Sequence, residues 1–248
     1  MRNSLYVILF LALFIGCKKE NTTIPASGGG PIAISPKEYL SSTNFDKLVI
    51  QIQCVNGFQP TQTAVDHLKT FLQQRLNKPD GVEVTYSNIS SPGKTIYTID
   101  DIRAIESTNR TVKHDGKTIT AYFLFIDGDY SQNNGNLKTL GIAYGTSSMV
   151  IFEKTIRDLS GGLGQPSVSS VETTVSEHEF GHLLGLVNYG TPATTSHEDG
   201  DHTKHCNNNN CLMYYATETS DFISNLIGSN IPSLDNNCIN DLKANGGK

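Results

Sequence analysis

The run from His178 to His182, His-Glu-Phe-Gly-His, contains the residue types that bind a metal ion and move a proton. If the run is helical, its two histidines share one face, where neutral imidazoles can bind one zinc ion about 2.0–2.1 Å away. Zinc lowers the pKa of a bound water to about 7, and the Glu179 carboxylate can accept the released proton. An amphipathic helix with surface histidines would give the same run. Taken alone, it predicts only a candidate zinc hydrolase.

A helix over about residues 169–184 must position these side chains. Ser169 and Ser170 mark its expected start, with Glu172 in the first turn, and Gly185 follows its last residue. A glycine at that position permits the left-handed turn that ends a helix and returns the chain toward the metal. We therefore expect a well-defined helix with its ligands near the C-terminal end.

Upstream of this helix, β-branched apolar runs alternate with segments of helical periodicity. The expected strands cover residues 48–55, 82–89 and 119–126, the expected helices cover 63–76 and 100–108, and a strand pair or bent edge strand covers 141–152. Two successive β-α-β crossovers favour parallel strands with helices packed on them. The sequence thus predicts an α+β fold with a mostly parallel twisted sheet, followed by one or two helices within 218–242.

The composition fits one globular domain with a tail. The chain has 248 residues, of which 37% are hydrophobic, and a formal net charge of -5. No basic patch is present to neutralise phosphates, which argues against a nucleic-acid partner. We expect a monomer.

The N-terminus has the pattern of a secretory signal. Arg2 precedes an apolar stretch over residues 5–15, which is too short to span a bilayer, and Cys17 follows directly after Gly16. Residues 13–17 resemble the lipobox of bacterial lipoproteins, which implies cleavage before Cys17 and lipidation of its thiol. A plain signal peptide with an incidental cysteine is the alternative.

This pattern predicts three segments, a lipoprotein signal peptide over 1–16, a flexible tether over 17–38 and a folded domain over 39–248. The tether is rich in Thr, Ser, Pro and Gly and buries too little apolar surface to order itself. Acyl chains bury methylenes at about 0.8 kcal/mol each, so a multiply acylated Cys17 anchors a soluble domain to a membrane. We expect an extracytoplasmic protein on a bacterial outer membrane.

The residues around the helix resemble a known family. The pattern His178-Glu179-x-x-His182-x-x-Gly185 is similar to the metzincin metallopeptidases. In that family the third zinc ligand follows three residues after the glycine, where this chain has Asn188. An amide oxygen is a poor zinc ligand beside imidazoles, so the chain departs from the family pattern here.

The resemblance resumes downstream, where His205-Cys206 is followed by Cys211-x-Met213. This stretch is similar to that of the archaemetzincins and implies that His205 is the third zinc ligand. It also implies that Met213 forms the methionine turn beneath the metal. Tyr215 matches the tyrosine that some metzincins place near the metal to stabilise the oxyanion.

Alternatives for the third ligand remain open, because the segment 188–204 is an insertion relative to the family. His202, His197 and Asn188 are candidates beside His205. Glu198 would be the third ligand if the chain belonged with the gluzincins, but it lies in a Gly/Asp turn rather than on a helix.

Four further cysteines would lie in an oxidising compartment, where disulfides persist. The local candidate pair is Cys206–Cys211, which leaves Cys54–Cys238, and buried thiols are the alternative. Archaemetzincins use a later Cys-x-x-Cys for a second zinc site. Since this chain has only Cys238 there, the resemblance implies one catalytic zinc ion and no second one.

Together these features predict a zinc endopeptidase that resembles secreted lipoprotein metalloproteases of Gram-negative bacteria. Glu179 would be the general base, and a protein or peptide substrate would add as a strand to the edge near residues 143–149. The alternative from another class is a non-catalytic zinc-binding surface lipoprotein.

Overall fold

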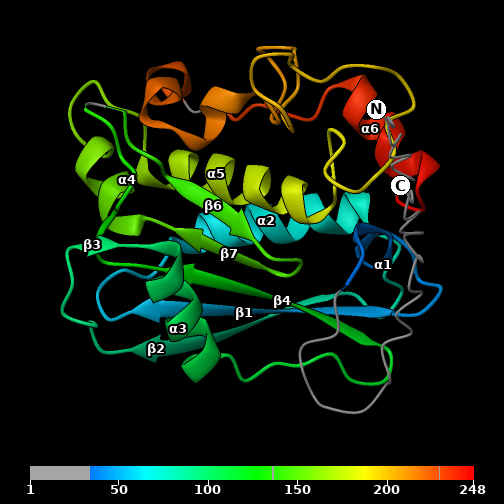
Figure 1. The fold of residues 1–248 in the computed structure, drawn as a ribbon, viewed down its shortest axis with the longest axis horizontal. Helices are drawn as coiled ribbons and strands as arrows, with labels where there is room; N and C mark the ends of the chain where they lie inside the picture. The colour runs from blue at the N-terminus through cyan, green and yellow to red at the C-terminus, as the bar shows by residue number, and fades with distance from the viewer. Residues whose placement is uncertain (1–33, 136, 229) are drawn as a thin grey trace, which may run out of the picture. The chain divides into compact units, whose positions relative to one another are not determined.

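A five-stranded sheet forms the centre of the molecule in the computed structural model, which describes residues 34–135, 137–228 and 230–248 (Figure 1). The strand order is β2-β1-β4-β7-β6, and only β6 is antiparallel to its neighbour. The strands are β1 (Lys47–Val55), β2 (Val82–Ile89), β4 (Thr118–Phe125), β6 (Gly141–Tyr144) and β7 (Ser148–Ile151). The predicted mostly parallel sheet with packed helices is confirmed, and the expected pair within 141–152 is the β6–β7 hairpin.

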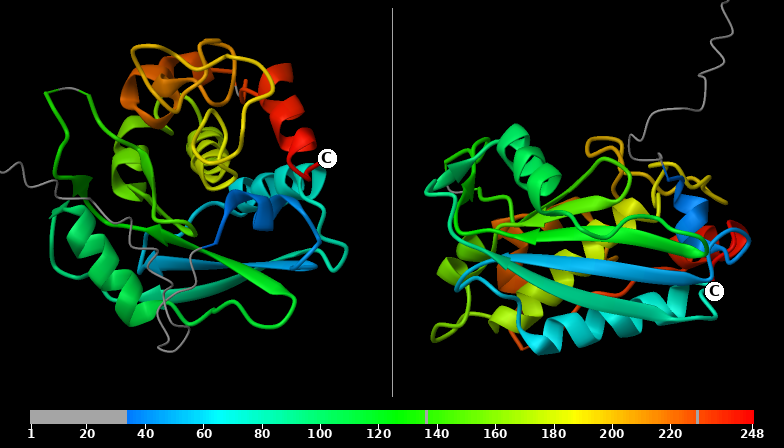
Figure 2. Two further views of the ribbon diagram at one scale, coloured as in Figure 1. Left: turned by 45° about the vertical axis from the view of Figure 1, so that its right-hand side comes forward. Right: turned by 90° about the horizontal axis from the view of Figure 1, so that it is seen from below.

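Helices cover both faces of this sheet. α2 (Gln62–Arg75) and α5 (Val168–Leu183) pack together on one face, and α3 (Ile99–Asn109) lies on the other (Figure 2). Alternate residues of β4 divide accordingly, with Phe123 in the core shared with α5 and Leu124 in the core shared with α3. Strands buried on both faces are largely apolar, as residues 121–125 of β4 are.

The remaining elements are short. They are α1 (Pro36–Leu40), β3 (Ile96–Tyr97), β5 (Asp129–Tyr130), α4 (Glu153–Leu159), the 3-10 helices η1 (Tyr215–Glu218) and η2 (Ser220–Leu226), and α6 (Asn236–Ala244). The helical segment expected within 218–242 is thus divided between η2 and α6. The sequence analysis did not anticipate α4 or the small β3–β5 sheet, because elements this short carry little periodicity.

The predicted signal peptide and Cys17 lie outside the described residues. Of the predicted tether, residues 34–38 are described, and they include the buried Ile34 and the start of α1. Across the described part of the chain, no helix has the length and apolarity needed to cross a membrane.

The central helix α5 begins at Val168, one residue earlier than its expected start near Ser169. Its N-cap is Ser167, whose side chain accepts a hydrogen bond from the Ser170 backbone N–H at 3.1 Å. Its end agrees with the sequence, since Gly185 follows with a φ of +73°. Every residue over 170–183 is buried, polar ones included. Buried polar groups need partners, so the surroundings of α5 must supply them.

One such partner lies where α5, α2 and α4 meet. The buried Glu172 carboxylate accepts hydrogen bonds from the Thr61 backbone N–H at 2.9 Å and from its hydroxyl. Thr61 is itself the N-cap of α2. Nearby, Arg157 donates to the buried Glu153. Burial, followed by the charge of Glu172, raises the pKa of Glu153 to about 9, so this junction retains a proton at neutral pH.

This raised pKa predicts a pH-dependent stability. Between pH 4.5, the usual pKa of a glutamate, and about pH 9, the folded state binds one more proton than the unfolded state. The stabilisation of the folded state by this proton is therefore lost as the pH rises through that window. The free energy of unfolding should fall there by up to about 1.4 kcal/mol per pH unit. Glu153→Gln keeps an oxygen for Arg157 and removes the titration, so its profile should be flatter.

Urea unfolding at several pH values between 5 and 9 measures this difference. Asp158→Asn is the matched control, because Asp158 is exposed on the same helix, and it should follow the wild-type profile. Equal slopes in the wild type and in Glu153→Gln would contradict the prediction.

Gly181 of α5 makes a close contact with Met213. A Cβ atom placed on Gly181 would lie 2.3 Å from Sδ and 3.1 Å from Cε of Met213. Met213 is fully buried. The missing side chain at Gly181 is therefore what lets Met213 pack directly against the helix next to His182.

This contact predicts non-additive changes in stability. Gly181→Ala overpacks the contact and should lower the free energy of unfolding by about 1–3 kcal/mol. Met213→Ala leaves a cavity and should lower it by about 2–5 kcal/mol. In the double variant the new methyl group enters the space left by the methionine, so the loss should be smaller than the sum by at least about 0.5 kcal/mol.

Urea unfolding of the three variants at one pH completes this double-mutant cycle. Gly200→Ala should match the wild type, because a Cβ there meets nothing within 4 Å. Additive losses would show that Gly181 and Met213 do not depend on each other.

Candidate metal centre

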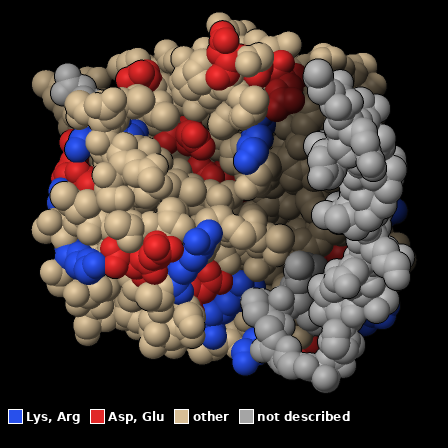
Figure 3. Space-filling model, viewed as in Figure 1, with Lys and Arg blue, Asp and Glu red and all other residues tan. Residues whose placement is uncertain are grey.

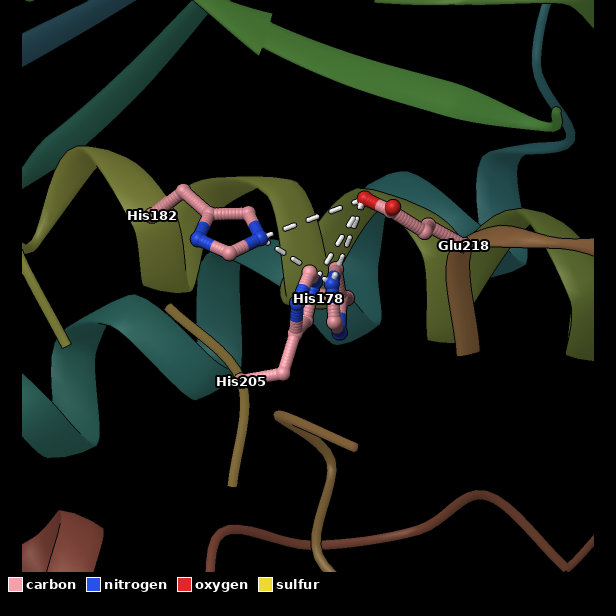
Figure 4. A group of neighbouring side chains, drawn as sticks. All are labelled: His178, His182, His205 and Glu218. Carbon is pink, nitrogen blue, oxygen red and sulfur yellow. Dashed lines mark hydrogen bonds and ion pairs between the residues drawn. The ribbon is translucent and has the colours of Figure 1, made fainter. Parts of the chain in front are cut away.

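Three imidazoles converge at the C-terminal part of α5 (Figure 4). The Nε2 atoms of His178 and His182 lie 3.1 Å apart. The His205 ring directly follows the inserted loop, and its centroid lies 5.4 Å from the ring of His178 and 5.0 Å from that of His182. The structure therefore brings together the three residues that the sequence analysis selected as metal ligands.

Backbone carbonyls orient two of these rings. Nδ1 of His178 lies 2.7 Å from the Leu212 carbonyl oxygen, and Nδ1 of His205 lies 3.1 Å from that of Thr203. Each Nδ1–H donates to its carbonyl, which leaves the lone pair on Nε2 directed at the other rings. Outer contacts of this kind fix the tautomer of metal-binding histidines. Nε2 of His205 is buried and has no hydrogen-bond partner.

A fourth side chain faces the rings. Oε2 of Glu218 lies 3.7 Å from Nε2 of His178, 3.7 Å from that of His205 and 4.0 Å from that of His182. Burial opposes its charge, but the nearby imidazoles of His178 and His205 hold the pKa of Glu218 below its usual range. Glu218 was not predicted as a site residue, since no motif spacing links it to the helix.

The donor set fits a zinc ion. The four ligand atoms lie within 4.8 Å of one another. Burial, then the charge of His178, lowers the pKa of His182, which keeps this imidazole neutral as a ligand requires. Three imidazole nitrogens with a carboxylate oxygen are ordinary ligands for zinc.

Glu179 lies beside this group on the same helix and is fully buried. Neither of its carboxylate oxygens has a hydrogen-bond partner within the part of the chain that the structure describes. Burial, followed by the charge of Glu218, raises the pKa of Glu179 well above its usual value. A Cβ on Gly141 would lie 2.8 Å from Oε1 of Glu179, so a glycine is needed where β6 crosses this side chain.

A cavity of about 270 Å³ connects these residues to the surface. Ile142 and Ala143 of β6 line one side, and Glu179 lies among the lining residues with three of the four possible ligands. The space-filling view shows acidic atoms inside the hollow between β6 and the overlying segments, with basic atoms at its rim (Figure 3). The cavity can therefore admit a substrate to the metal-binding residues along an edge strand.

Two further cavity residues were not identified from the sequence. The Tyr189 ring lies edge-on to His182, with 5.6 Å between their centroids. Nζ of Lys204 lies 4.3 Å from the centroid of the Tyr189 ring. Both belong to the inserted loop, where no family motif indicates a role.

The Tyr215 ring packs against His202 and is not part of the cavity wall. Its ring stacks on that of His202, with centroids 3.5 Å apart and planes at 2°. Nδ1 of His202 lies 3.1 Å from Oδ2 of Asp199. The structure therefore places His202 in a contact with Tyr215 rather than among the ligands, and Tyr215 does not line the cavity.

The other ligand candidates are also engaged elsewhere. Nε2 of His197 lies 2.7 Å from Oδ2 of Asp241. The Asn188 side-chain amide donates to Oε2 of Glu198 at 2.8 Å. These contacts keep His197, Asn188 and Glu198 out of the group formed by the three imidazoles.

The four described cysteines are buried free thiols. The expected pairs Cys206–Cys211 and Cys54–Cys238 are not formed, and the Sγ atom of Cys238 instead lies 3.7 Å from that of Cys211. Sequence spacing did not reveal this proximity, because α6 is folded back onto the loop.

A second group of possible metal ligands lies at these thiols. It consists of His197, Cys206, Asp235 and Cys238. The absence of a second metal site was expected because only Cys238 stood in the place of a Cys-x-x-Cys pair. A histidine of the inserted loop and Asp235 lie beside two of the cysteines, so a candidate ligand set exists where the resemblance implied none.

No protein-family model and no curated protein sequence matches the chain. Among solved structures, the archaemetzincin from Methanopyrus kandleri is similar with a TM-score of 0.52 and 17% identity, over 81% of this chain and 96% of that one. Metalloproteinase-II from Bacteroides fragilis aligns with a TM-score of 0.43 and 16% identity, over 83% of this chain and 54% of that one. At this level of identity the first similarity shows the fold, so the chain has the fold of an archaemetzincin.

Proposed function

We propose that this chain is a zinc-dependent metalloendopeptidase whose catalytic ion is held by His178, His182 and His205. The observation that carries the proposal is the convergence of three imidazoles beside the buried and unpartnered carboxyl group of Glu179. A zinc ion bound there supplies Lewis acidity and lowers the pKa of water. Hydrolysis then needs no nucleophilic side chain.

Glu179 acts as the general base and then as the general acid. Its burial and lack of protein partners favour proton uptake, since burial disfavours the charged carboxylate. From the cavity it can take a proton from the attacking water and return it to the leaving amine. The oxyanion requires a donor on the cavity wall. Tyr189 is placed better for this than Tyr215, the residue expected from the sequence, because Tyr189 lines the cavity.

The edge strand β6 is the proposed seat of an extended peptide. It pairs with β7 along one side only, and Ile142 and Ala143 line the cavity. An extended peptide can bind such an edge by main-chain hydrogen bonds. A protein or peptide substrate is therefore favoured over a small molecule.

The setting of the enzyme is a further part of the proposal. A lipid on Cys17 would hold a monomeric domain on the outer membrane, as the lipobox resemblance implies. A non-catalytic zinc-binding lipoprotein would need the same histidines but has no use for Glu179, so the first test below separates the two functions.

Glu179→Gln should retain zinc and lose cleavage of a peptide library by about 10²–10⁴-fold, because the amide cannot accept the proton. Mass spectrometry of the digested library measures cleavage, and elemental analysis measures the metal. Glu177→Gln is the control, since Glu177 is buried on the same helix but does not line the cavity.

Full cleavage by Glu179→Gln would disprove the role of the base. Zinc binding by a wild type that cleaves no peptide would favour the non-catalytic alternative.

His205→Ala should lose one equivalent of zinc, or bind it at least about 100-fold more weakly. Loss of a residue that only orients a metal ligand already lowers metal affinity by about 10–100-fold, and loss of a ligand itself should cost at least as much. His202→Ala should bind zinc as the wild type does, since His202 lies against Tyr215. Competition with a chromophoric chelator measures both affinities. The reverse pattern would transfer the third ligand to His202.

A further inference from the structure

Glu218 is the last residue of η1 and faces the three imidazoles from the opposite side of the candidate site (Figure 4). Its Oε2 atom is 3.7–4.0 Å from the three Nε2 atoms, and two of these nitrogens are 3.1 Å apart. Bonds of 2.0–2.2 Å in a tetrahedral zinc site separate the ligand atoms by roughly 3.4 Å. The four atoms therefore need only small shifts to surround one ion.

The backbone around Glu218 is fixed rather than part of a free loop. The Leu140 backbone N–H donates to the Glu218 carbonyl oxygen at 2.8 Å, and the Ser220 N–H donates to the Lys138 carbonyl oxygen, also at 2.8 Å. These bonds attach the segment to the residues that lead into β6. The position of the carboxylate opposite the histidines is thus set by the sheet edge.

The Glu218 side chain nevertheless has room to move. It is 28% exposed, whereas the His178 side chain is fully buried. Glu218 also lines the cavity. A change of rotamer can therefore move the carboxylate from the imidazoles into the cavity without moving the backbone.

We propose that Glu218 is a fourth protein ligand of the zinc ion and closes the site in the resting protein. The inference rests on the three-histidine site of the proposed function. Catalytic zinc sites have three protein ligands and one open position, whereas sites with four protein ligands are closed. Access of water and substrate then requires the Glu218 carboxylate to leave the ion. The two acidic residues have separate roles, with Glu218 as the displaceable ligand and Glu179 as the base.

Glu218→Gln tests this assignment through metal binding rather than activity. Because an amide oxygen is a poorer ligand, zinc affinity should fall at least about 10-fold in chelator competition. Acetohydroxamate, a small zinc-binding probe, should bind the zinc-loaded variant about 10-fold more tightly than the wild type, since it no longer has to displace a carboxylate. The absorption spectrum of the cobalt-substituted protein should change as well, because one oxygen ligand is altered.

Asp221→Asn is the matched control, since Asp221 lies three residues away and is exposed. It removes the same charge and should leave all three measurements unchanged. If Glu218→Gln does not fold, Glu218→Asp keeps the charge but shortens the side chain, and it should also weaken zinc and strengthen acetohydroxamate binding.

The outcomes separate this inference from the proposed function. Suppose that His205→Ala loses an ion, whereas Glu218→Gln binds that ion, and acetohydroxamate, as tightly as the wild type does and has an unchanged cobalt spectrum. The fourth-ligand assignment is then overturned and the three-histidine site stands. Equal effects of Glu218→Gln and Asp221→Asn would also overturn it, as a mere effect of charge. If the wild type and His205→Ala bind the same amount of zinc with the same affinity, both proposals fall.

Discussion

The structure depends on burying a polar helix. Every residue of α5 over 170–183 is buried, yet this stretch carries carboxylates and imidazoles whose removal from water is costly without partners. Thr61 donates hydrogen bonds to Glu172, and the Leu212 carbonyl accepts one from His178. Helix α2 on one side and the loop before η1 on the other must therefore be in place for α5 to be stable. The residues that hold the site together and those that hold the fold together are largely the same.

Much of this arrangement could be predicted from local patterns. Apolar strands and the four-residue spacing of His178 and His182 are properties of short segments, and the structure follows them closely. Glu218 and the Cys211–Cys238 proximity could not be predicted, because each depends on how distant segments fold back onto α5. His205 was predictable only in part, because its role was inferred from a family resemblance and its position depends on a long inserted loop.

The inserted loop supplies much of what surrounds the candidate ligands. The chain enters it through Val187 and Asn188, which have left-handed conformations with φ values of 53° and 61°. It adds Tyr189 and Lys204 to the cavity wall, and it carries His197 to the thiols of the C-terminal region. Differences in substrate preference among proteins with this fold can thus arise in the loop, while α5 and its two histidines stay constant.

His205 and Cys206 are neighbours in the chain but belong to different groups of possible ligands. The peptide unit between them is held from the other side, because the Cys206 N–H donates to the Met213 carbonyl oxygen at 2.7 Å. One peptide unit thus contributes a side chain to each of the two groups. The backbone that presents His205 to α5 therefore also fixes the position of Cys206 in the second group.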